Sequence, residues 1–324
     1  HLLCPIFALI AKMKLSANYT DAIVVLHKGK IVYERYLGVT TPASQHIAFS
    51  VTKSFVGTMA EMLVEEGRLD PAAPMGDLIP ELARSGFADA ALRQVMDMTT
   101  AIDFSEEYTD PNSGIGAMSN ALGLTPRAPG YAGPTDVYAF LPTIGKNGTH
   151  GERFTYRTAN TEVLGWLVAR TEGKRLDQVL SERIWQPLGM EQDADFLIDS
   201  TGMPFAGGGL NPVLRDMARF GEAMRCGVML NGRNWRLVQA HGCSCMARWI
   251  GSNGRGGVLD RTQSPHCVTF RHQHRQHHPN QTMDYVSKAG TGFAVLTDRQ
   301  QRRCRCQPSD SEHTGEQQPT SSDQ

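Results

Sequence analysis

The spacing of hydrophobic and polar residues is typical of a globular protein up to about residue 240. Residues 20–38, TDAIVVLHKGKIVYERYLG, contain two β-rich runs around a Lys-Gly turn, which predicts a hairpin. Residues 50–66 have helical spacing, and Gly67 stands where a C-terminal cap belongs. Similar patterns predict further helices, over 88–100, 161–174, 176–190 and from the glycine turn at 207 to residue 227, with Pro212 in the first turn of the last one.

Residues 241–324 have a different texture, with an excess of cysteine, histidine, arginine and glutamine. Apart from YVSKAGTGFAVLTD (285–298), which resembles a final strand, this tail has no clear helix or strand periodicity, and its end is predicted to be disordered. Three interpretations stay open: a solvated and poorly ordered tail, a lost reading frame near residue 240, or a metal-binding tail. The third would use His272, His274, His277 and His278.

Composition narrows the classes of function. The 324 residues are 40% hydrophobic and carry a formal net charge of −1, which suits one large core or two packed lobes and gives no indication of a nucleic-acid partner. No apolar run reaches the roughly 20 residues of a membrane span. The apolar segment 2–11 is either a first core helix or the remnant of a signal peptide, and the sequence begins with His1. The seven cysteines include no CxxC pair, so we expect no metal site and a reducing, cytoplasmic location.

The segment HIAFSVTKSFVG brings a serine and a lysine together at the start of a predicted helix. Ser50 and Lys53 are three residues apart, so both side chains face the same side. A serine hydroxyl needs a nearby base, and a lysine amine can act as one where burial lowers its pKa. The field of the helix N-terminus also favours developing negative charge. The alternative is that Ser50 only caps the helix and Lys53 is exposed.

A second candidate segment is FTYRTANTEVLGW (154–166). Tyr156 precedes a predicted helix, and a tyrosine beside a lysine ammonium can act as a general base. The alternative is a half-buried tyrosine that only packs where the helix begins.

Together these segments resemble the serine-active penicillin-recognising superfamily, which includes the class C β-lactamases and their esterase relatives. Within it, the chain is most similar to the nylon-oligomer (6-aminohexanoate-dimer) hydrolases and related carboxylesterases. The similarity covers roughly residues 20–235 and rests on FSVTKSFVG, MTTAIDFSEEYTDPNS, FTYRTANTEVLGWLVARTEG, IWQPLGM and GGGLNPVLRDMARFGEAM.

The resemblance implies an α/β (α+β) fold of the β-lactamase/transpeptidase type, an antiparallel sheet flanked by helices with a mostly helical lobe. We therefore expect a catalytic region over 1–240, with the helical lobe inserted at roughly 68–200, and the separate tail over 241–324.

The resemblance also implies roles for individual residues. Ser50 would be the acylated nucleophile, with Lys53 and Tyr156 as its proton acceptors. Tyr108, in SEEYTDP, would contact the substrate amide, and Asn211, in GGGLN, would line the substrate site.

Two departures from the family pattern are visible. The Y-x-N motif reads Tyr156-Arg157-Thr158, so Thr158 takes the substrate-binding position of the motif asparagine. This favours the nylon-hydrolase branch, and Asn160 could partly substitute for the missing asparagine. The third family motif, K-T-G or H-x-G, has only one K-x-G candidate downstream, formed by Lys288 and Gly290.

The expected function is that of a serine hydrolase. It would cleave a small ester or linear amide through an acyl-enzyme and would need no cofactor or metal. The alternatives are a β-lactamase or D,D-peptidase-like activity, and a catalytically impaired relative that only binds ligand.

Overall fold

We describe a computed structural model of the chain, covering residues 20–27, 29–226, 229–230, 233–234 and 293–296. The expectations for Lys288 and Gly290, for the histidine-rich segment and for the end of the tail lie outside these residues. No helix within the described ranges is both long enough and apolar enough to cross a bilayer.

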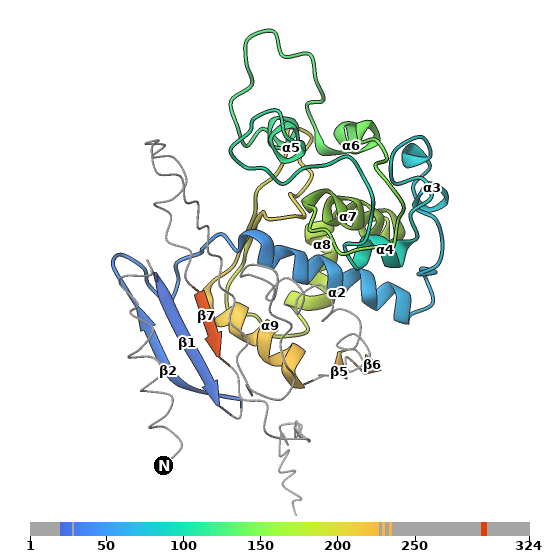
Figure 1. Ribbon diagram of the computed structural model, residues 1–324. Helices are drawn as coiled ribbons and strands as arrows, with labels where there is room; N and C mark the ends of the chain where they lie inside the picture. Colours follow the sequence, from blue (N-terminus) through green and yellow to red (C-terminus); the bar gives the residue numbers. More distant parts are fainter. Residues whose placement is uncertain (1–19, 28, 227–228, 231–232, 235–292, 297–324) are drawn as a thin grey trace, which may run out of the picture.

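The sheet lies at one side of the molecule (Figure 1). Strands β1 (Ala22–His27) and β2 (Lys30–Tyr36) pair antiparallel, as predicted, and Gly29 has the positive φ of +75° that the tight turn requires. Strand β7 (Phe293–Leu296) pairs with the other edge of β1 but runs parallel to it. Strand β1 is therefore central, and its run of buried apolar residues is typical of a strand covered on both faces.

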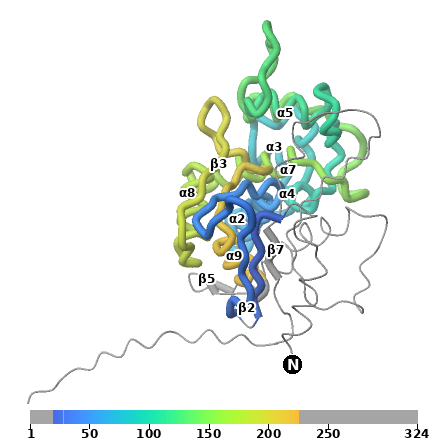
Figure 2. The backbone as a smooth tube through the Cα atoms, turned by 90° about the vertical axis from the view of Figure 1, so that its left-hand side faces the viewer, coloured from blue at the N-terminus to red at the C-terminus, as the bar shows by residue number. Residues whose placement is uncertain are grey.

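Helix α2 (Thr52–Glu65) runs through the centre, directly after the short turn η2 (Phe49–Val51). Both views place the sheet on one side of α2 and the helices between residues 75 and 172 on the other (Figures 1 and 2). Phe55, Met59 and Leu63 are fully buried on this helix, and the Phe55 ring stacks on Phe220 at 3.8 Å between centroids. The predicted cap at Gly67 is confirmed, with φ +68°.

A group of helices lies on the side of α2 that faces away from the sheet (Figure 1). Its central helix, α7 (Thr158–Glu172), packs on α2 and ends at Gly173 in the left-handed conformation, as predicted. The prediction over 88–100 was too long, because the chain forms only α4 (Leu92–Met96) and then turns through Met98 at φ +57°. The other elements are α3 (Met75–Leu78), η3 (Pro80–Leu82), α5 (Gly114–Leu122), α6 (Val137–Phe140), η4 (Leu141–Thr143), α8 (Leu176–Leu180) and the π-helical turn η5 (Ser181–Trp185).

A short two-stranded sheet brings the glycine segment 207–209 to the beginning of α2. Strands β3 (Asp195–Phe196) and β4 (Leu210–Asn211) pair antiparallel. The Ala48 N–H donates to the Leu210 carbonyl at 2.8 Å, so β4 lies beside the lead-in to Ser50.

Helix α9 (Leu214–Cys226) follows and packs against β1. Pro212 precedes this helix and is not in its first turn, which corrects the prediction. A further two-stranded pair joins β5 (Met229–Leu230) and β6 (Arg233–Asn234).

Candidate active site

Ser50 accepts hydrogen bonds from two side chains, one three residues further along the chain and one from a distant segment. The Lys53 Nζ donates to Ser50 Oγ at 3.2 Å, and the Tyr156 hydroxyl donates to the same oxygen at 2.6 Å. The Lys53 Nζ also lies 5.1 Å from the centroid of the Tyr156 ring. The structure thus brings together the three residues that the sequence assigned to catalysis, which come from the start of α2 and from the segment before α7.

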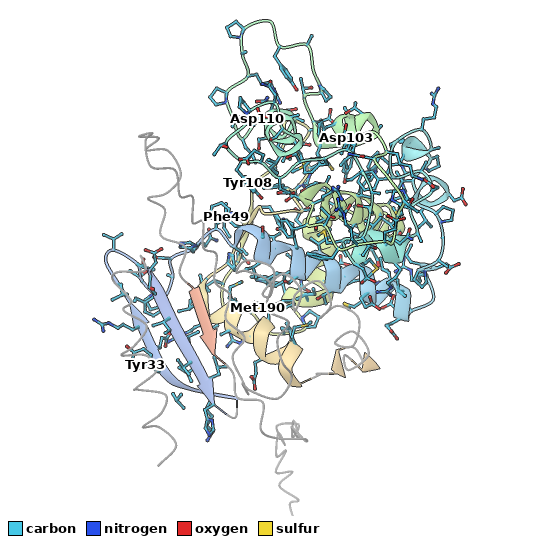
Figure 3. The ribbon with its side chains drawn as sticks, viewed as in Figure 1. Tyr33, Phe49, Asp103, Tyr108, Asp110 and Met190 are labelled. Carbon is cyan, nitrogen blue, oxygen red and sulfur yellow. The ribbon has the colours of Figure 1, made fainter. Side chains whose placement is uncertain are left out.

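The alternative in which Ser50 merely caps the helix is wrong. The N-cap of α2 is Val51, with no side-chain cap, and Ser50 lies in the preceding η2 turn. Lys53 is partly buried and hydrogen-bonded. Phe49, directly before Ser50, has φ +43°, a conformation that costs a non-glycine residue about 1–3 kcal/mol and that clusters at functional sites. Figure 3 shows both Phe49 and Tyr108 at the end where α2 begins.

Lys53 has a second partner that the sequence analysis missed. Its Nζ donates to the backbone carbonyl of Gly207 at 2.5 Å. The N–H of the same residue donates to Glu162 Oε1 at 2.5 Å, and the Ala206 N–H donates to Oε2 at 3.2 Å. The three-glycine run at 207–209 was a visible signal for a tight backbone approach, whereas Glu162 gave no signal because it sits inside an ordinary helical pattern.

Burial dominates the electrostatics of Glu162. Only 1% of the residue is exposed, and this burial raises the pKa of its carboxyl group to about 8. The two backbone N–H donors and the positive charge of Lys53 lower this pKa, and thus offset part of the burial.

Tyr108 and Thr158, both predicted to bind substrate, meet at Glu106. The Tyr108 hydroxyl donates to Glu106 Oε2 at 2.6 Å, and the backbone N–H of Thr158 donates to Oε1. Burial of the hydroxyl and the neighbouring carboxylate of Glu106 raise the pKa of Tyr108, so this phenol stays protonated and keeps its hydrogen bond to Glu106. With 49% of Tyr108 exposed, part of its ring remains open to a ligand. Glu106 lies within the family-like stretch but was not singled out from the sequence.

Two asparagines are engaged elsewhere. Asn160 is fully buried; its Oδ1 accepts from Thr100 Oγ1 at 2.8 Å, and its amide nitrogen faces the Met98 sulfur at 3.3 Å. The expectation that Asn160 replaces the motif asparagine is therefore wrong. The Asn211 amide nitrogen donates to the carbonyls of Gly209 at 2.8 Å and Asp195 at 3.3 Å, so it ties β4 to β3.

The described residues contain no group of three or more histidine, cysteine, aspartate or glutamate side chains that could hold a metal ion. A serine hydroxyl held by a lysine one turn away and by a tyrosine from a second segment defines the class of SxxK serine acyl-transfer sites.

Comparison with known proteins agrees with this class. The chain belongs to the Beta-lactamase family, whose profile matches residues 13–315. The resemblance inferred from the sequence is thereby confirmed.

Two relatives carry the name 6-aminohexanoate-dimer hydrolase. The enzyme of that name from Paenarthrobacter ureafaciens is 38% identical over 221 residues, which cover 68% of this chain and 56% of the relative. A solved structure from Bacillus anthracis, described as a candidate 6-aminohexanoate-dimer hydrolase, is 35% identical with a TM-score of 0.64 and covers 69% of this chain and 58% of that one. The chain thus spans a little over half the length of these relatives.

A more distant structure supports the fold alone. A candidate β-lactamase from Bacteroides dorei is 20% identical, with a TM-score of 0.55, and covers 73% of this chain and 68% of that one. The predicted fold class, α/β of the β-lactamase/transpeptidase type, is confirmed.

Proposed function

We propose that this chain is a serine hydrolase that cleaves small esters or linear amides through a covalent acyl-enzyme. The observation that carries the proposal is the pair of hydrogen bonds from Lys53 Nζ and the Tyr156 hydroxyl to Ser50 Oγ. Two potential proton acceptors on one serine oxygen are what a weak oxygen nucleophile needs.

In the first step, Ser50 Oγ attacks the substrate carbonyl carbon while its proton passes to the Lys53–Tyr156 pair. The carbonyl oxygen becomes an oxyanion, which the Ser50 backbone N–H and the beginning of α2 stabilise. Collapse of this intermediate breaks the bond to the leaving alcohol or amine, which takes the proton from the pair. Water then attacks the acyl-enzyme by the same route in reverse, releasing the acid and restoring Ser50.

We propose that the substrate binds on the side of Ser50 where Tyr108 and Thr158 lie. The Tyr108 hydroxyl gives its single proton to Glu106, so its oxygen can accept a hydrogen bond from the N–H of a substrate amide. Asn211 is a second candidate, since β4 runs beside the lead-in to Ser50. Lys288 and Gly290 remain the candidates for the third family motif, and removal of one oxyanion donor would lower the rate about 100–1,000-fold.

We also retain the proposed division into a catalytic region over 1–240, with the lobe at 68–200, and a tail over 241–324. The change in composition near residue 240 supports it. The ligand class is a small ester or amide, because the named function of the relatives and the Thr158 position both favour the amidase and esterase branch over β-lactam turnover. The cysteine pattern supports a cytoplasmic location.

The test is release of p-nitrophenol from its acetate and butyrate esters by the wild-type protein and by Ser50→Ala. We expect turnover that disappears in the variant, together with fluorophosphonate labelling of Ser50 only in the wild type. Equal release by both proteins would show that another group reacts. No release and no labelling, with thermal protection by 6-aminohexanoate dimer, would instead indicate a relative that only binds ligand.

A further inference from the structure

Glu162 lies directly behind Lys53, and the backbone of one residue, Gly207, connects them through its N–H and its carbonyl oxygen. Its Oε1 accepts from the N–H of Gly207, whose carbonyl oxygen in turn accepts from Lys53 Nζ; both bonds are 2.5 Å long. Its Oε2 accepts from the Ala206 N–H at 3.2 Å. Both carboxyl oxygens are thus used to hold consecutive backbone groups of one segment.

The surroundings of Gly207 leave this segment little freedom. A β-carbon at Gly207 would lie 2.3 Å from Thr158 Cγ2 and 2.8 Å from Glu162 Oε1, closer than real contacts allow. Thr158 and Glu162 stand one turn apart on α7, so one helix supplies both walls. Residue 207 must be glycine because α7 approaches its backbone so closely. The carboxyl group of Glu162 then holds this backbone through the Gly207 N–H.

We propose that Glu162 is a positioning residue for Lys53. By holding the Ala206 and Gly207 N–H groups, it fixes the Gly207 carbonyl that keeps Lys53 Nζ within reach of Ser50 Oγ. This assignment rests on the proposed function, and it adds a buried carboxyl group to the machinery. Glu162 touches neither Ser50 nor Tyr156 through any hydrogen bond of the described residues, so it acts through Lys53 alone.

The role depends on the ionisation state of Glu162. A carboxylate accepts both N–H groups, whereas a protonated carboxyl group must turn one oxygen into a donor. The charged and titratable groups that face it are Lys53 from α2, Asp199 from the β3–β4 connection and Tyr138 from α6. The support that Glu162 gives to the Gly207 peptide should therefore strengthen as its proton is lost.

The matched pair for the test is Glu162→Gln and Asp216→Asn. Asp216 is also fully buried, and its two oxygens also accept consecutive N–H groups, those of Glu191 at 2.7 Å and Gln192 at 3.1 Å. It additionally bonds Arg219, and its hydrogen bonds go to none of the three site residues. Each variant removes one buried charge and one backbone acceptor, but only Glu162→Gln touches the segment that holds Lys53.

The measurement is the rate of fluorophosphonate labelling of Ser50 at about pH 6 and about pH 9 in the full chain, either side of the Glu162 pKa of about 8. At the higher pH we expect Glu162→Gln to label about 10–100-fold more slowly than the wild type, and at the lower pH we expect a much smaller difference. Asp216→Asn should label at the wild-type rate at both values. A wild-type to Glu162→Gln ratio that does not change with pH, or an equal loss in Asp216→Asn, would overturn the proposal.

Hydrogen–deuterium exchange separates this proposal from the proposed function. We expect faster exchange of the Ala206 and Gly207 amides in Glu162→Gln and of the Glu191 and Gln192 amides in Asp216→Asn. If the wild type does not label at all, the serine hydrolase assignment fails while exchange still reports on the peptide. If Ser50 labels but the Ala206 and Gly207 amides exchange at the same rate in the wild type and in Glu162→Gln, Glu162 does not hold this segment.

Discussion

The contribution of Glu162 to the stability of the protein should fall as pH rises from about 4.5 to about 8. Its carboxyl group is buried, and burial raises its pKa from an ordinary 4.5 to about 8 in the folded state. In that window the folded protein binds a proton that the unfolded chain has lost. Folding is therefore favoured most below the unfolded pKa, and this contribution disappears as pH rises through the folded pKa.

The size of the effect follows from the proton difference. One extra proton in the folded state lowers the free energy of unfolding by about 1.4 kcal/mol per pH unit between the two pKa values. Over the whole window the upper limit is about 5 kcal/mol, and over two pH units in its middle about 3 kcal/mol. The Glu162→Gln variant has no ionisable group at this position, so its stability lacks this slope whatever its absolute value.

The assay is urea unfolding of wild type and Glu162→Gln, followed by the fluorescence of the buried Trp166 and Trp185. Measurements at about pH 5.5 and about pH 7.5 give the stability difference between the two proteins, in which the common titrating groups cancel. We expect the wild type to lose about 3 kcal/mol relative to the variant across this interval. A constant difference would mean that the two N–H groups and Lys53 fully offset the burial, and the reasoning would be refuted.

Three further predictions concern the core and the surface. Phe55→Ala should lower the free energy of unfolding by about 3–5 kcal/mol, since this buried ring stacks on Phe220; a loss below 1 kcal/mol in urea unfolding would contradict that packing. Gly57→Ala, inside α2 with open space at its Cβ, should raise stability by about 0.5–1 kcal/mol, whereas Gly207→Ala should lower stability and slow Ser50 labelling; equal melting temperatures for the two would speak against the crowding at Gly207. Arg215→Ala breaks the two hydrogen bonds to Glu34 that join α9 to β2, yet it should cost at most about 1 kcal/mol because the pair is partly exposed, and high salt should shrink that cost further.

The hairpin and the two long helices could be predicted because local signals agree with the tertiary structure there. The turn glycine separates two strand-like runs in 20–38, and Gly67 and Gly173 end helices whose apolar spacing is clear. The three proposed catalytic residues could be singled out for the same reason: Ser50, Lys53 and Tyr156 stand where helices begin. A helix start is a position that sequence patterns indicate well.

Glu162 could not be predicted because α7 breaks the rule that polar residues face water. Its positions 158–168 are all buried, including the polar Asn160, Thr161 and Glu162. A polar residue on such a buried helix needs a hydrogen-bond partner inside the protein, but the sequence does not identify that partner. The partner here, the 206–207 backbone, follows 44 and 45 residues later, and only the packing of the glycine run against α7 brings the two together.

Thr158 joins the two flanks of the site, which gives a physical account of the departure from Y-x-N. Its backbone N–H donates to Glu106, which accepts from Tyr108 on the side where we propose that substrate binds. Its methyl group faces Gly207, the residue that bonds Lys53 on the other side. An asparagine would replace the compact methyl group with a longer polar amide against the Gly207 backbone, where a β-carbon already has no room. The threonine therefore suits a site in which a buried carboxyl group and a close glycine segment hold the lysine, and a larger side chain at this position should disturb the Gly207 backbone and with it Lys53.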